Sequence, residues 1–350
     1  MEAKLVLEDG TMLKGGLFGA PISTAGEVVF NTGMVGYPES MTDPSYEGQI
    51  LVCTYPLIGN YGIPSGENYF GMPKNFESNR IHVSGLIVAD YSDSYSHWAA
   101  KKSLAKWMRE NGIPGITGID TRFLTKKLRA NGVILGKIIV GKEIPFEDPN
   151  KKNLVKEVSP KNPVVYKSGK KKVVLVDCGA KNNIVRSLLE RKITVIRVPW
   201  DHPFQDIKCD GLMISNGPGD PKMCIQTINS IKEVMKKEIP IFGICLGNQL
   251  LSLAAGADTY KLKFGHRGQN QPAIDVKTKR CYITSQNHGF AVNPKKLPSA
   301  WEQWFVNAND KTNEGIRHKR KPFYSVQFHP EATPGPTDTN WLFDKFEGDL

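Results

Sequence analysis

The chain has 350 residues, 40% of them hydrophobic and 23% charged, and its formal net charge is +11 at pH 7. This length allows two domains of ordinary size, each with its own core, and the composition is that of a globular protein. No stretch approaches the roughly 20 apolar residues of a membrane span, and the acidic start, MEAKLVLEDG, argues against a secretion signal.

Six cysteines are scattered along the chain, and none belongs to a C-x-x-C pair. This spacing argues against a zinc site and against a disulfide framework. We therefore expect free thiols in a reducing compartment, a cytoplasmic location, no metal site and no membrane partner.

Residues 1–150 are dense in glycine, proline and short apolar runs such as LVLEDG, EVVFNTG and QILVCTYP. Two segments, 98–111 and 121–130, have the apolar spacing of helices. We expect residues 1–150 to form the smaller of two domains, with a mixed α/β fold.

Residues 151–172 combine proline, serine and glycine with eight lysines and a single glutamate. The segment shows little periodicity, and we interpret it as a lysine-rich linker between two domains. Much of the positive charge of the chain is therefore concentrated here. Nucleic-acid binding by this segment is the alternative, but a solvated connector explains the charge better, and we expect no nucleic-acid partner.

Residues 173–350 alternate between apolar strand patterns and helical patterns. Such alternation predicts an α/β fold with a mostly parallel sheet flanked by helices. In sheets of this kind, ligands bind beyond the carboxyl ends of the strands. The expected strands are 173–179, 193–199 and 239–245, and a further strand is expected to run into a loop within 211–221. The expected helices are 181–190, 225–237 and 246–256.

The sequence GICLG, residues 243–247, stands where a strand stops and a helix begins. G-x-C-x-G is the thiol form of the turn that exposes a nucleophile above a sheet, with Gly243 and Gly247 removing side chains that would clash. The helix beginning at Leu246 would stabilise a Cys245 thiolate, and the Leu246 N–H would be the first oxyanion donor. The alternative is a glycine-rich turn with an inert buried thiol.

A thiol nucleophile needs a base, and the base needs a group to orient it. The stretch FYSVQFHPE (323–331) ends a strand pattern at His329 and places Glu331 two residues later. A single histidine is more often structural, but the pairing with G-x-C-x-G favours a triad. His288 is a rival base that has no neighbouring glutamate.

GICLGNQ together with QFHPE resembles the class I, triad-type glutamine amidotransferases, which place cysteine, histidine and glutamate in this order. SNGPGDP (215–221) resembles the oxyanion loop of that family. The resemblance implies that the backbone around Gly217 and Gly219 faces the substrate opposite Leu246. Without it, this loop is a tight turn that needs a flexible backbone, and both interpretations can hold together.

TSQNHGFAV (284–292) resembles the glutamine-pocket segment of the small subunit of carbamoyl-phosphate synthetase. The resemblance implies substrate contacts from Asn287, Gly289 and Phe290, and from Gln249 one turn after the nucleophile. It also implies that Ser45, in the sequence DPSY, reaches the glutamine site. The alternatives are a polar turn between strands at QNHGF and an ordinary turn serine at position 45.

Segments of the N-terminal half, 30–62, 83–92 and 113–132, also resemble that small subunit, so the resemblance covers essentially the whole chain. It implies a cysteinyl-thioester glutaminase that supplies ammonia to a large subunit in a heterodimer or higher oligomer. The chain has no G-x-x-x-x-G-K-[ST] loop. We therefore expect no cofactor on this chain, whereas ATP and Mg²⁺ would bind the large subunit, which makes carbamoyl phosphate from bicarbonate for pyrimidine and arginine biosynthesis.

Two alternatives remain open. One is the amidotransferase subunit of another synthetase, such as those for GMP or anthranilate, and the N-terminal 150 residues argue against it. The other is a non-catalytic regulatory module that binds glutamine, and the intact cysteine, histidine and glutamate set argues against that.

Overall fold

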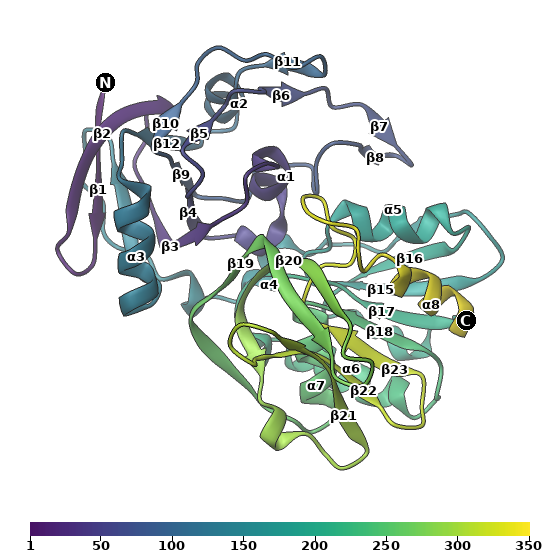
Figure 1. Cartoon of the computed structure of the whole chain (residues 1–350). Coiled ribbons are helices and arrows are strands. Elements are labelled where there is room, and N and C mark those ends of the chain that lie inside the picture. Colours follow the sequence, from purple (N-terminus) through teal and green to yellow (C-terminus); the bar gives the residue numbers. More distant parts are fainter. The chain divides into compact units, whose positions relative to one another are not determined.

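The computed structural model describes all 350 residues, which form two compact units, Met1–Lys152 (unit 1) and Asn153–Leu350 (unit 2). Unit 1 is built on a closed seven-stranded barrel (Figure 1). Alternation explains its strands, because Ala3, Leu5 and Leu7 of the first strand are buried while their neighbours face outward. The order around the barrel is β1 (Glu2–Leu7), β13 (Ile134–Ile139), β3 (Thr24–Asn31), β4 (Gln49–Cys53), β9 (Gly85–Ile87), β12 (Pro114–Thr117) and β2 (Met12–Gly19).

Three helices and several short strands complete unit 1. The helices are α1 (Tyr37–Thr42), α2 (Leu104–Glu110) and α3 (Thr121–Asn131), and the 3₁₀ turns are η1 (Pro44–Tyr46) and η2 (Pro149–Lys151). The short strands are β5 (Leu57–Ile58), β6 (Ile63–Pro64), β7 (Asn68–Tyr69), β8 (Met72–Pro73), β10 (Asp90–Tyr91) and β11 (Ala100–Lys102). Helix α3 begins where Asp120 caps the backbone N–H of Phe123 at 2.8 Å, and it matches the expected helix closely.

The helix expected over 98–111 begins six residues later than its apolar pattern suggests. Trp98 is 90% exposed, and Ala100–Lys102 form β11, which pairs with β6. The Ser103 side chain accepts a hydrogen bond from the Lys106 N–H and so caps α2. Ser103 lies inside the apolar pattern, and because it caps the helix, α2 begins at Leu104.

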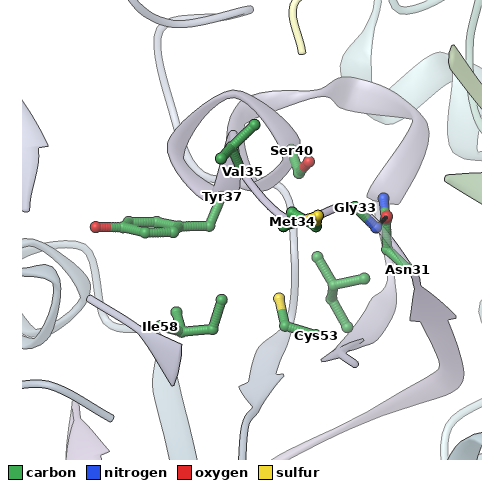
Figure 2. Close-up of a pocket in the computed structure, with 9 residues that line it drawn as sticks. Asn31, Gly33, Met34, Val35, Tyr37, Ser40, Cys53 and Ile58 are labelled. Carbon is green, nitrogen blue, oxygen red and sulfur yellow. Dashed lines mark hydrogen bonds between the residues drawn. The ribbon is translucent and has the colours of Figure 1, made fainter. Parts of the chain in front are cut away.

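One small cavity lies between the start of α1 and strands β4 and β5 (Figure 2). Tyr37 and Val35 line it from one side, and Cys53 and Ile58 line it from the other. Its volume is about 10 Å³, which is room for about one water molecule. Burial raises the pKa of the Cys53 thiol to about 12, so we interpret this cysteine as a core residue and not as a nucleophile.

Unit 2 contains a ten-stranded mixed sheet in which five central strands are parallel (Figure 1). The parallel strands are β16 (Thr194–Pro199), β15 (Lys172–Asp177), β17 (Gly211–Ile214), β18 (Ile241–Ile244) and β23 (Phe323–Val326), in that order. Beyond β23 the sheet continues as antiparallel strands β22 (Asn313–His318), β21 (Trp301–Asn307), β19 (Thr259–Asp275) and β20 (Cys281–Val292). The expected α/β fold is confirmed, with a large antiparallel extension that the strand–helix alternation did not predict.

Helices cover both faces of the parallel strands (Figure 1). Helices α6 (Ile225–Met235) and α7 (Leu246–Ala254) share a core with alternate residues of the strands, including Val174, Leu212 and Ile241. On the other face lie α5 (Asn182–Glu190) and α8 (Trp341–Asp349), and Phe242 contacts the rings of Phe343 and Phe346 in α8. Short 3₁₀ turns are η3 (Phe204–Asp206), η4 (Pro221–Met223) and η5 (Pro294–Lys296).

The segment 151–172, expected to be a linker, contains secondary structure that belongs largely to unit 2. Helix α4 (Leu154–Val158) buries Val155 in the core of unit 2. Strand β14 (Val164–Tyr166) pairs antiparallel with β16 at the edge of the sheet. The lysines of segment 151–172 are exposed. The positive charge that suggested a linker therefore lies on solvent-facing side chains near the edge of the sheet. No helix in either unit is long and apolar enough to cross a membrane.

Candidate active site

Cys245 occupies a sharp turn between β18 and α7. Its φ of 56° is left-handed, which is uncommon for a residue other than glycine and marks a strained backbone. A Cβ at Gly243 would lie 2.5 Å from the carbonyl oxygen of Gly247, and a Cβ at Gly247 would lie 2.2 Å from that of Ile214. Both glycines are therefore required for this turn to pack against the sheet.

The end of β17 supplies a second loop beside this turn. A Cβ at Gly217 would lie 2.0 Å from the Cys178 carbonyl oxygen and 2.9 Å from Leu246 Cδ2, so Gly217 is packed directly against Leu246. Gly219 has a left-handed φ of 81°. Leu246 begins α7, so its N–H has no partner within the helix. The structure therefore places the Gly217 backbone beside the start of α7, and the expected oxyanion role of these backbone groups stays a prediction.

His329 and Glu331 follow β23 and lie beside the Cys245 turn. His329 Nδ1 is 2.6 Å from Glu331 Oε1, and both side chains are almost completely buried. The His329 backbone N–H donates to the Ser285 carbonyl oxygen at 2.9 Å, which fixes the histidine against β20. His329 Nε2 makes no hydrogen bond of normal geometry, but the Cys245 side chain is close enough to affect its protonation.

The charges at this site favour a protonated histidine. Burial disfavours the imidazolium, but Glu331 and then Cys245 outweigh burial and raise the pKa of His329. Burial also disfavours the carboxylate of Glu331, but Lys181 and His329 lower its pKa below the usual range. Lys181 Nζ lies 3.1 Å from Glu331 Oε1. A thiol beside an imidazolium is the environment that activates a cysteine nucleophile.

The residues expected to bind glutamine lie mainly on β20 and α7. The Cys245 thiol donates to the Asn287 carbonyl oxygen at 3.6 Å, and Gln249 Nε2 donates to the Phe290 carbonyl oxygen at 3.0 Å. Gly289 lies between Asn287 and Phe290 on β20. The sequence QNHGF is therefore the interior of a strand and not a polar turn. Strand β20 therefore runs beside the Cys245 thiol.

Ser45 lies in η1 of unit 1, where its backbone N–H donates to Asp43 Oδ1 at 2.9 Å. Its side chain is buried. Its expected contact with glutamine stays a prediction.

His288, the rival base, has both ring nitrogens engaged. Nδ1 donates to the Phe290 carbonyl oxygen at 2.8 Å, and Nε2 lies 3.2 Å from the Gln286 amide. Burial and the neighbouring His266 hold the pKa of His288 well below its usual value. This histidine is therefore neutral at physiological pH and less suited than His329 to act beside a thiolate.

His266, His288 and Glu314 place one ligand atom each within 4.8 Å of one another, a spacing that could hold a metal ion. His266 nevertheless lies 2.9 Å from Asp310 and 3.3 Å from Glu314. Burial opposes its protonation, but the two carboxylates raise the pKa of His266 to about 9. A charged His266 balances one of the two carboxylates, while burial raises the pKa of Glu314.

Sequence reasoning missed two buried residues of this site, Lys181 and Gln327. Lys181 stands in the sequence DCGAKNN after β15, and its ammonium group contacts Glu331. Gln327 Nε2 lies 3.6 Å from Cys245 Sγ. Their positions could have indicated a role in the site, because Lys181 follows the carboxyl end of β15 and Gln327 follows that of β23.

Residues 174–348 match the family model described as glutamine amidotransferase class-I. The chain belongs to this family. Residues 5–138 of this amidotransferase match the CPSase domain of the carbamoyl-phosphate synthase small chain. The expected resemblance is therefore confirmed for both halves of the chain.

Two relatives match nearly the whole of this amidotransferase. Multifunctional protein CAD of Squalus acanthias is 56% identical over 352 residues, which cover 98% of this chain and 16% of the relative. Carbamoyl-phosphate synthase (ammonia), mitochondrial, of Homo sapiens is 53% identical over 351 residues, which cover 98% of this chain and 23% of the relative. The chain thus spans less than a quarter of the length of either protein.

Proposed function

We propose that this chain is the glutaminase component of a glutamine-dependent carbamoyl-phosphate synthase. One observation carries the proposal: Cys245 stands on a strained turn at the end of β18, beside His329, which Glu331 holds at 2.6 Å. The match to the small-chain CPSase domain supports this synthase over those for GMP or anthranilate. One relative is named carbamoyl-phosphate synthase (ammonia), so the similarity alone does not decide between glutamine and free ammonia as the nitrogen source. The cysteine, histidine and glutamate of this site favour glutamine.

The first half of the reaction forms a thioester. The Cys245 thiolate attacks the side-chain amide carbon of L-glutamine, and the carbonyl oxygen becomes an oxyanion. The Leu246 N–H and the loop containing Gly217 and Gly219 stabilise that charge. His329, protonated and oriented by Glu331, gives its proton to the departing nitrogen. Ammonia leaves, and a γ-glutamyl thioester remains on Cys245.

The second half releases glutamate. His329, now neutral, removes a proton from water, and the hydroxide attacks the thioester through a second oxyanion at the same site. The C–S bond breaks, glutamate leaves and the Cys245 thiolate is restored. Lys181 stabilises the Glu331 carboxylate throughout, so Glu331 stays ionised and keeps the imidazole in place.

The remaining chemistry belongs to a partner. Carbamoyl phosphate synthesis consumes ATP, and we propose that ATP, Mg²⁺ and bicarbonate bind a large partner subunit in a heterodimer or higher oligomer. Ammonia must pass to that subunit shielded from water, because at pH 7 it is mostly protonated and cannot act as a nucleophile. The pathways served would be pyrimidine and arginine biosynthesis, in the cytoplasm, where six free thiols suit the reducing conditions.

Glutamate release from glutamine by the purified chain, alone and with a candidate large subunit, tests the proposal. We expect hydrolysis, co-elution with the large subunit in size-exclusion chromatography, and carbamoyl phosphate synthesis from glutamine by the complex. A complex that makes carbamoyl phosphate from ammonium salt but not from glutamine would contradict the glutaminase role. Separate elution at micromolar concentrations would contradict the proposed partner.

A further inference from the structure

A fully buried network of side-chain amides lies beneath Cys245, and the proposed mechanism has not used it. Gln327 is its centre and has no exposed surface. Its Oε1 accepts hydrogen bonds from Asn248 Nδ2 and Gln249 Nε2, each at 3.1 Å. Asn248 in turn accepts from the Ser325 hydroxyl at 2.8 Å. The network therefore joins the end of β23 to the first turn of α7.

The orientation of the Gln327 amide follows from a backbone carbonyl. The Phe290 carbonyl oxygen can only accept, so the Gln249 atom 3.0 Å from it must be the NH₂ group. The same NH₂ group faces Gln327, so the Gln327 atom it meets must be the oxygen. The NH₂ group of Gln327 is then the end that faces Cys245 Sγ at 3.6 Å.

Two polar groups at the same distance from the sulfur have opposite preferences. The Asn287 carbonyl oxygen, 3.6 Å from Sγ, accepts a hydrogen bond from the neutral thiol and repels a thiolate. The Gln327 N–H, also 3.6 Å from Sγ, donates and therefore favours the thiolate. Gln327 is fully buried and Cys245 is 2% exposed, so a hydrogen bond from this donor is electrostatically stronger here than it would be in water.

We propose that Gln327 is a catalytic residue that stabilises the Cys245 thiolate through its N–H while its oxygen holds Gln249 in place. This inference rests on the proposed glutaminase function. Both N–H groups of Gln249 are used within the protein, on Phe290 and on Gln327. Its Oε1 is the atom left for the substrate, so Gln249 would meet a donor such as the ammonium or amide group of glutamine.

The test measures the rate of Cys245 alkylation by iodoacetamide against pH, read by peptide mass spectrometry. The variants are Gln327→Met, which has similar volume and no amide, and Gln327→Asn, which keeps an amide but is one methylene too short. Thr227→Val is the matched control, because it removes a fully buried hydroxyl that donates to the Trp200 carbonyl oxygen and takes no part in this network. The exposed Cys281 is an internal reference in every sample, and the fully buried Cys178 stays unlabelled only while unit 2 is folded.

In both Gln327 variants we expect Cys245 alkylation at pH 7 to slow about tenfold and its midpoint to move up by about one pH unit. Cys281 labelling and the Thr227→Val variant should show no such shift. Glutaminase kcat should fall with the alkylation rate in both variants, and KM should rise because Gln249 loses its anchor. An unchanged Cys245 midpoint in folded Gln327→Met and Gln327→Asn would overturn the inference. If glutamine fails to protect wild-type Cys245 from labelling, the glutaminase proposal itself is contradicted.

Discussion

Two cysteines stand just beyond parallel strands of the same sheet, and their surroundings differ in almost every respect. Cys178 follows β15 and precedes α5, and Cys245 follows β18 and precedes α7. Cys178 is fully buried, and its N–H donates to the Ser215 hydroxyl. Burial, and then Cys224 and Asp177, raise its pKa well above the usual value. Its sulfur receives no hydrogen bond from an imidazole or an amide.

Cys245 has the left-handed φ, the adjacent helix start, the Gln327 N–H and the His329 imidazole that Cys178 lacks. The same residue at the same edge of a sheet is thus inert in one place and poised for chemistry in the other. The difference lies in the turn and the neighbours, and not in the thiol itself.

Exchanging sulfur for oxygen at each position should give the largest contrast. Cys245→Ser should reduce glutamine hydrolysis by about 10⁴-fold or more, because a hydroxyl is far less ionised than a thiol at neutral pH. Cys178→Ser should leave kcat within about twofold and cost about 1–3 kcal/mol of unfolding free energy, because it buries a hydroxyl. Glutaminase assays and urea unfolding of both variants check this. Equal activity in the two variants would erase the contrast.

Removing the base and its orienting group should give graded losses. His329→Ala should lower kcat by about 10²–10⁴-fold, because proton transfer to the leaving nitrogen and from water is lost. Glu331→Ala should cost less in kcat, since it removes orientation and the raised pKa of His329 but leaves the imidazole. Steady-state glutaminase kinetics measure both. A Glu331 loss larger than the His329 loss would reverse the assigned roles.

The smallest expected effect is on stability at high pH. Burial raises the pKa of Cys224 to about 12, and burial with Cys224 and Asp177 raises that of Cys178. The folded state therefore holds these protons more tightly than the unfolded state. The resulting stabilisation is complete below the unfolded pKa of about 9 and is lost as pH rises above it.

We expect wild-type unfolding free energy to fall by about 3 kcal/mol more between pH 8 and pH 10 than that of a Cys178→Ala, Cys224→Ala double variant. Urea unfolding of both proteins at each pH measures the difference. Parallel pH profiles would show that these thiols ionise as easily in the folded protein as in the unfolded one.

Much of unit 2 could be predicted because its local patterns agree with its tertiary structure. The strand–helix alternation gave the parallel strands and α5, α6 and α7 within a few residues. The motifs then placed Cys245 and His329 at strand ends, and the structure brings His329 and Glu331 to hydrogen-bonding distance. A motif at a sheet edge is predictable because parallel strands direct their carboxyl ends to one side.

The parts that sequence reasoning missed depend on long-range contacts. Gln327 has no local sign of its role, because its partners are brought near only by the pairing of β18 with β23. Lys181 meets Glu331 across about 150 residues of chain. The segment 151–172 looked like a linker because exposed edge lysines and a true connector have the same composition. A turn was the alternative for QNHGF (286–290) because a strand that lines a polar site is itself polar.

The most direct test of the account asks which sulfur carries the substrate. Wild-type protein is mixed with isotope-labelled L-glutamine, quenched in acid during turnover, digested and examined by mass spectrometry for a γ-glutamyl thioester. The account predicts the adduct on the peptide containing Cys245 and none on the peptide containing Cys178. It also predicts that His329→Ala changes how much of the adduct accumulates but not its position. Sustained glutamine hydrolysis in the Cys245→Ser variant, or an adduct on any other cysteine, would contradict it.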